Sequence, residues 1–113
     1  MRQRWIDDIA QLLFEAEKNK TEVLKMTEKF PKLTIQTAYE VQRKLVQMKE
    51  KQEQTKRSGY KLGLTSRAKQ EMMGVHEPTY GVLLESMQLI EGEKVSLAPF
   101  IHPKIEPEIA FIF

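Results

Sequence analysis

The chain has 113 residues, of which 41% are hydrophobic and 30% charged, a profile of one modest globular domain. It contains no cysteine, which excludes disulfides and thiolate sites. The net charge is +2, and the basic residues are interspersed with acidic ones instead of forming the basic patch that binds nucleic acids. No apolar run reaches the length of a membrane helix, and Asp7 and Asp8 interrupt any signal peptide, so we expect a cytoplasmic protein that binds neither membranes nor nucleic acids.

Two amphipathic helices are predicted in the first half of the chain. Residues 2–18 repeat apolar side chains at intervals of three and four. Thr21 is expected to cap a short helical turn, which Pro31 ends. Thr34 is a typical N-cap residue and opens a long helix that runs towards Gly59. The apolar face of this helix contains Ile35, Ala38, Tyr39, Gln42, Leu45 and Val46.

The second half of the chain has a strand-like composition. Residues 60–65 predict a strand, Ser66 can cap a short helix, and Gly74 occupies the place of a C-terminal glycine. The stretch "HEPTYG" at residues 76–81 is typical of a turn. Three further strands are expected at residues 82–90, 93–97 and 105–113. Because helices come first and strands after, the order predicts an α+β fold rather than alternating α/β.

The predicted fold lacks a cover for its apolar surfaces. Two amphipathic helices need a sheet or a partner, and the last expected strand is too apolar for an exposed sheet edge. We therefore expect the chain to be the N-terminal part of a larger protein, or a truncated gene product.

Two carboxylates, Glu106 and Glu108, interrupt the apolar stretch "IHPKIEPEIAFIF". On a strand, side chains two residues apart lie on the same face. Neighbouring carboxylates repel each other, and a hard divalent cation relieves that repulsion. The alternative is a solvated edge strand, protected from aggregation by its charges and by Pro107. Spacing alone favours this alternative, because two ligands do not complete a metal site.

Lys61 lies between Gly59 and Gly63 in "GYKLGLTS". A lysine on such a strand could point inward, where it would bind a carboxylate or assist proton transfer, although an ordinary surface lysine fits the same pattern.

His76 and His102 lack the spacing of metal ligands, and we interpret His102 as a residue that makes a structural hydrogen bond.

Taken together, these segments resemble a known family. The stretches "GYKLGLTSRAKQEMMGVHEPTYGVL" and "IHPKIEPEIAFIF" are similar to the 2-hydroxypenta-2,4-dienoate hydratase and 4-oxalocrotonate decarboxylase family, part of the fumarylacetoacetate hydrolase superfamily. More loosely, "TIQTAYEVQRKL" resembles the family's A-Y-x-x-Q helix. The resemblance implies an N-terminal helical segment at residues 1–57 and the first, incomplete part of a catalytic mixed β-roll at residues 58–113.

The resemblance also implies roles for individual residues. Glu106 and Glu108 correspond to a pair of ligands for Mg²⁺ or Mn²⁺, which needs a third acid beyond residue 113. Lys61 corresponds to the family's active-site lysine. Thr65 and Thr79 are the candidate substrate-binding residues.

The turn "EPTYG" distinguishes two branches of the family. Hydratases of the family usually have an aspartate where this chain has Thr79, and an aspartate is a candidate for activating water. We therefore expect a lyase that decarboxylates 2-oxo-3-hexenedioate to 2-hydroxypenta-2,4-dienoate in the meta-cleavage catabolism of aromatic compounds, with the metal making the 2-oxo group an electron sink. The alternatives are 2-hydroxypenta-2,4-dienoate hydratase, or an inactive remnant or interaction module. The expected partners are the 2-oxo dicarboxylate substrate, a hydratase of the family and a second copy of the chain in a homo-oligomer.

Overall fold

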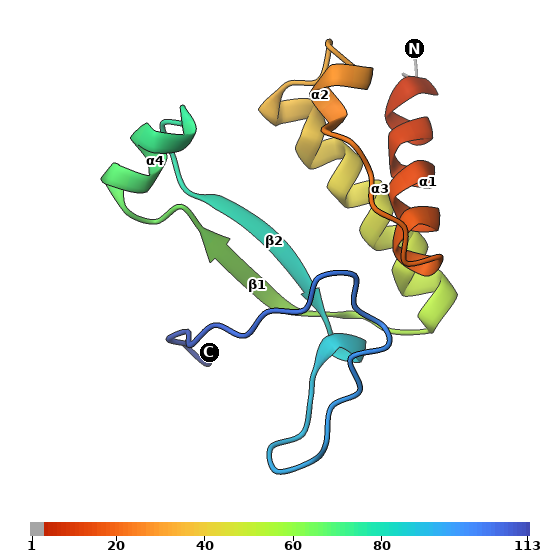
Figure 1. Ribbon diagram of the computed structural model, residues 1–113, viewed down its shortest axis with the longest axis vertical. Coiled ribbons are helices and arrows are strands. Elements are labelled where there is room, and N and C mark those ends of the chain that lie inside the picture. Colours follow the sequence, from red (N-terminus) through yellow and green to blue (C-terminus); the bar gives the residue numbers. More distant parts are fainter. Residues whose placement is uncertain (1–3) are drawn as a thin grey trace.

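Three helices form one side of the molecule in the computed structural model, which describes residues 4–113 (Figure 1). They are α1 (Arg4–Lys18), α2 (Met26–Lys29) and α3 (Ile35–Glu53). The two long helices were predicted at these places by apolar periodicity, and residues 2 and 3 of the first prediction lie outside the described residues. None of the helices in residues 4–113 combines the length and apolar character needed to cross a bilayer.

The helices α1 and α3 lie side by side and run in the same direction (Figure 1). Ion pairs progress in the same sense along both: Lys44 binds Asp7 at 2.6 Å, and Lys49 binds Glu17 at 2.9 Å. Because residues 19–34 carry the chain back, α3 can start beside the beginning of α1. The buried cluster between the two helices consists of Ile6, Ile9, Ala10 and Val41, none more than 4% exposed.

Side-chain caps fix the start of two helices. The Thr34 hydroxyl accepts a hydrogen bond from the Thr37 N–H at 3.1 Å, and the Thr34 N–H donates to the Thr37 hydroxyl at 2.8 Å, a capping box that opens α3. The Ser66 hydroxyl accepts from the Lys69 N–H at 3.2 Å and opens α4 (Arg67–Met73), which Gly74 ends with a left-handed φ of 72°. These capping predictions are confirmed.

The predicted cap at Thr21 is wrong. Residues 21–25 form no helix, and the first helical residue is Met26. A hydroxyl caps N–H groups two or three positions further on, so Thr21 lies too far from this helix. Its side chain instead donates to the carbonyl of Asn19 at 3.4 Å.

A two-stranded antiparallel hairpin forms the other side of the molecule, with α4 in its connection (Figure 1). Its strands are β1 (Arg57–Gly63) and β2 (Thr79–Leu84). The register places Lys61 opposite Gly81, and Gly63 opposite Thr79. The turn predicted at residues 76–81 is therefore wrong at its end, since the last three of these residues pair with β1. Such pairing depends on a distant segment and not on the local turn residues.

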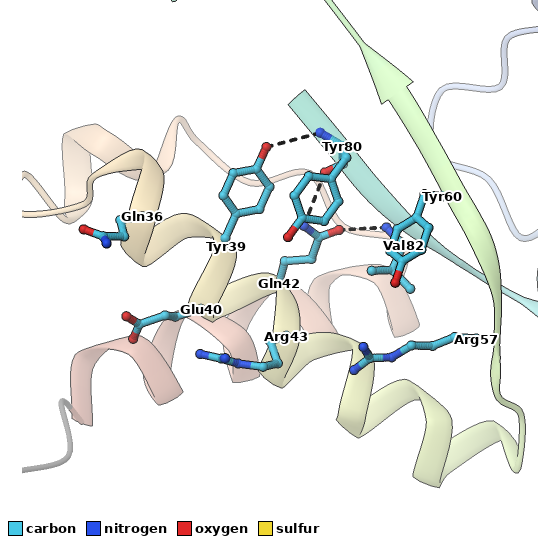
Figure 2. Close-up of a pocket in the computed structure, with 9 residues that line it drawn as sticks. All are labelled: Gln36, Tyr39, Glu40, Gln42, Arg43, Arg57, Tyr60, Tyr80 and Val82. Carbon is cyan, nitrogen blue, oxygen red and sulfur yellow. Dashed lines mark hydrogen bonds between the residues drawn. The ribbon is translucent and has the colours of Figure 1, made fainter. Parts of the chain in front are cut away.

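The helix α3 joins the hairpin through a side-chain amide. Gln42 donates to the carbonyl of Tyr80 at 3.3 Å and accepts from the Val82 N–H at 2.9 Å (Figure 2). The Tyr39 hydroxyl accepts from the Tyr80 N–H at 3.2 Å. These bonds occupy backbone groups of β2 as a neighbouring strand would.

The strands predicted after β2 are absent from the structure. The chain passes from Leu84 into the 3₁₀ turn η1 (Glu85–Met87), and residues 88–113 contain no helix or strand. The strands expected at 93–97 and 105–113 are therefore wrong, as is most of the one expected at 82–90. A strand forms only with a partner for its hydrogen bonds, and no described segment pairs with these residues.

Candidate functional site

Lys61 lies in the middle of β1, and its side chain is exposed. Alternation along the strand places it on the opposite face from Tyr60 and Leu62. Its side chain makes no hydrogen bond or ion pair with any residue in 4–113. The residue across the ladder is Gly81, so no cross-strand side chain covers the ammonium group. Lys61 is thus a cation available for an anionic ligand.

Thr79 shares the face of Lys61. It lies opposite Gly63, two residues from Lys61 along β1, which makes Lys61 and Thr79 diagonal neighbours on the hairpin. A Cβ at Gly63 would lie only 3.1 Å from the Thr79 hydroxyl oxygen, so the glycine makes room for that hydroxyl. The structure therefore brings two of the predicted site residues together.

Thr65 follows the end of β1 in a turn of unusual backbone conformation. The preceding residue, Leu64, has φ 53°, a left-handed value that is rare for a side chain of this size. The amide of Gln70 donates to the Leu64 carbonyl at 2.8 Å and holds the turn against α4. Strained turns of this kind are common beside ligand sites. Thr65 is exposed at this turn and outside the paired strand.

Glu106 and Glu108 lie in the irregular C-terminal segment, where both are exposed. The expectation that a strand holds them on one face is not met. Neither carboxylate makes a hydrogen bond or ion pair within the described part of the chain. Two unpaired carboxylates are suitable oxygen ligands for Mg²⁺ or Mn²⁺. Among residues 4–113, no group of three His, Asp or Glu side chains is arranged to hold a metal, and no bond joins the pair to Lys61.

His102 contacts the carboxylate of Glu22, which links the C-terminal segment to the loop before α2. The structural hydrogen bond predicted for this histidine is therefore confirmed.

Three tyrosines that the sequence did not predict to be neighbours meet at the junction of α3 and the hairpin. Tyr39 of α3 stacks on Tyr80 of β2, with ring centroids 4.4 Å apart (Figure 2). Tyr60 of β1 meets Tyr80 edge-on at 5.9 Å. The helix stretch "AYEVQ" is the signal that could have found them, because its tyrosine and glutamine both contact β2.

No family model matches the chain, but curated proteins do. The chain is 40% identical over 104 residues to 2-oxo-hept-4-ene-1,7-dioate hydratase of Escherichia coli. It is 38% identical over 104 residues to 4-oxalocrotonate decarboxylase of Pseudomonas sp. strain CF600. Each alignment covers 92% of this chain and 39% of the relative. The chain thus spans about two fifths of the length of these relatives.

Solved structures show the same similarity in three dimensions. The 4-oxalocrotonate decarboxylase of Pseudomonas putida G7, complexed with calcium and acetate, is 32% identical and matches with a TM-score of 0.81. That match covers 90% of this chain and 39% of the decarboxylase. The same enzyme complexed with magnesium and adipate is 34% identical, with a TM-score of 0.67 over 76% of this chain and 32% of that one. The fold described above is therefore part of the decarboxylase fold.

Proposed function

This chain is homologous to part of the 4-oxalocrotonate decarboxylase and 2-keto-4-pentenoate hydratase family, and on that premise we propose that it contributes to a divalent-metal-dependent lyase. The proposed reaction is decarboxylation of 2-oxo-3-hexenedioate to 2-hydroxypenta-2,4-dienoate. Residues 1–57 would form the helical segment, and residues 58–113 would begin the catalytic domain. The observation that carries the proposal is the structural match to a decarboxylase whose complexes contain calcium or magnesium.

The face of the hairpin that carries Lys61 and Thr79 is the proposed substrate site. The reaction breaks the bond to the terminal carboxylate and moves its electron pair through the conjugated chain towards the 2-oxo oxygen. The ammonium of Lys61 would bind a carboxylate of the substrate and balance negative charge as it develops. The hydroxyls of Thr79 and Thr65 would donate hydrogen bonds that orient the same substrate.

Glu106 and Glu108 are the proposed metal ligands in this chain. Their two carboxylates supply hard oxygen donors, and a further ligand is required to complete the set. A divalent cation held there would withdraw electrons from the 2-oxo group when bound. Because the chain spans only part of its relatives, these two residues are proposed as part of a site and not as the whole of it.

Hydration is the second candidate reaction, and the similarity to the E. coli hydratase favours it. The presence of Thr79 favours decarboxylation instead. A threonine hydroxyl is a weaker base than a carboxylate and is therefore less able to activate the water that hydration consumes.

The metal assignment can be tested by titrating the chain with Mn²⁺ and following the bound ion by paramagnetic resonance. Replacing both carboxylates, in Glu106→Gln/Glu108→Gln, is expected to weaken binding by about tenfold or more, because an amide is a poorer ligand for a hard cation. Glu91 and Glu93 have the same spacing in the same irregular segment, so Glu91→Gln/Glu93→Gln is a matched control that should bind as before. Equal affinity in the two double variants would contradict the assignment.

Product analysis tests the reaction itself. With 2-oxo-3-hexenedioate and Mg²⁺, the lyase to which this chain contributes is predicted to release CO₂, and Lys61→Gln in that lyase should abolish the release. Addition of water to 2-hydroxypenta-2,4-dienoate, without loss of CO₂ from the dicarboxylate, would favour the hydratase reaction instead.

A further inference from the structure

A cavity of about 350 Å³ lies where α3 meets the hairpin (Figure 2). Three tyrosines and two arginines form most of its lining: Tyr39, Tyr60, Tyr80, Arg43 and Arg57. Its volume is in the range of pockets that hold small molecules, roughly 300 to 1,000 Å³. We propose that this cavity binds a small planar carboxylate, at a site separate from the Lys61 face.

The position of the cavity separates it from the proposed substrate site. Tyr60 precedes Lys61 in β1, and consecutive side chains of a strand point to opposite faces. Tyr80 lies opposite Leu62 and precedes Gly81, so it also points away from the face of Lys61. A ligand in the cavity therefore contacts a surface that Lys61 does not share.

The aromatic side chains give the cavity a flat apolar wall. Tyr39 and Tyr80 stack with an interplanar angle of 11°, and Tyr60 meets Tyr80 at 74°. The hydrogen bond that the backbone N–H of Tyr80 donates to the Tyr39 hydroxyl fixes this pair in place. A flat, conjugated ligand can pack against such rings by offset stacking or edge contact.

Some polar side chains of the lining already make hydrogen bonds within the protein, and others make none. Each end of the Gln42 amide makes one hydrogen bond to β2, and these two bonds fix its orientation. In contrast, the guanidinium of Arg43 and the hydroxyls of Tyr60 and Tyr80 make no hydrogen bond or ion pair within residues 4–113. These groups donate hydrogen bonds, and a carboxylate accepts them.

The charged side chains of the lining favour an anionic ligand over a cationic one. The lining contains the guanidinium groups of Arg43 and Arg57 but a single carboxylate, that of Glu40. Among the described residues, Arg57 makes one long ion pair, in which its Nε lies 3.8 Å from a carboxylate oxygen of Glu50. Figure 2 shows the Arg57 side chain extending from β1 towards α3, while the Arg43 side chain extends along α3 in the direction of Glu40. The planar guanidinium fork matches the two oxygens of a carboxylate, which makes this ligand class the best fit.

The experiment is a titration of the isotope-labelled 113-residue chain with benzoate, followed by NMR of the backbone amides. The site predicts saturable shifts at the amides of Tyr39, Tyr80 and Val82. Benzamide has the same shape without the charge and should bind about tenfold more weakly, because it loses the charge-assisted hydrogen bonds. Arg43→Gln/Arg57→Gln should weaken benzoate binding to a similar extent, again about tenfold.

Two control variants separate this site from the proposed active site. Arg67→Gln removes an arginine that lies outside the cavity and should leave benzoate affinity unchanged. Lys61→Gln should also leave it unchanged, whereas the same substitution in the lyase to which this chain contributes should abolish CO₂ release. Equal binding of benzamide and benzoate, unchanged affinity in Arg43→Gln/Arg57→Gln, or loss of binding in Lys61→Gln would each overturn the proposal. Failure of Mn²⁺ binding would count against the proposed metal site only.

Discussion

At the scale of single residues, Gln42 has the clearest structural role. Its amide donates to one backbone group of β2 and accepts from another, as the backbone of a third strand would. The exposed edge of a short hairpin is otherwise prone to pair with other chains. The glutamine of the A-Y-x-x-Q stretch therefore acts as a cover for this edge and attaches the hairpin to α3.

Replacing this residue by Gln42→Ala should lower the free energy of unfolding by about 2 kcal/mol, because two hydrogen bonds of about 1 kcal/mol each are lost. Urea denaturation followed by circular dichroism measures the change. Gln36→Ala is the matched control, since Gln36 lies on the same helix, is exposed, and its side chain makes no hydrogen bond within residues 4–113. A loss of the same size in both variants would mean that the bonds to β2 contribute nothing.

At the scale of elements, α3 is the helix that connects the two sides of the molecule. Val41 packs against α1, while Tyr39 and Gln42 contact β2. A helix with two contact surfaces needs a fixed start, because a shift along its axis would misplace both. The capping box at Thr34 supplies that start.

The contribution of this cap can be measured with Thr34→Ala. The variant should unfold at lower urea concentration, with a loss of about 1 kcal/mol, because N–H groups of the first turn lose their acceptor. Hydrogen exchange at the Thr37 amide should rise in parallel. Thr21→Ala is the control, because the Thr21 hydroxyl caps no helix; a loss as large as that of Thr34→Ala would rule out the capping explanation.

At the scale of the whole molecule, the buried core is small and lies between α1 and α3. The hairpin adds one fully buried side chain, that of Leu84, and residues 88–113 add none. Many large apolar side chains remain exposed, including Leu62 at 61%, Ile105 at 97% and Ile112 at 97%. The stability of the chain therefore depends on the few buried side chains of the helix pair.

The core residue Ile9 is 1% exposed, and Ile9→Ala should cost roughly 2 to 5 kcal/mol of unfolding free energy, through lost burial and the cavity that remains. Leu24 is 80% exposed, so Leu24→Ala should change stability little. Thermal unfolding of the two variants gives the comparison. Similar unfolding temperatures for both would show that the helix pair is not the stable core.

The sequence predicted the elements whose signals are local. Apolar periodicity placed the two long helices, and Thr34, Ser66 and Gly74 marked helix ends, because a cap bonds to groups only a few residues away. The glycines on either side of Lys61 marked this lysine as a candidate site residue. The strand limits were predicted less well, since each strand forms only where a distant partner supplies hydrogen bonds.

The sequence by itself determined the order of the two long helices before the strands, the caps of α3 and α4, and the identity of the candidate site residues. Only the tertiary structure decided which of those residues meet. The hairpin register brings Lys61 and Thr79 to one face, whereas Glu106 and Glu108 lie in a segment without a strand partner. The contacts of Tyr39 and Gln42 with β2 were likewise decided by the tertiary structure. The physical reason is that register and packing arise from contacts between distant segments, which local composition does not encode.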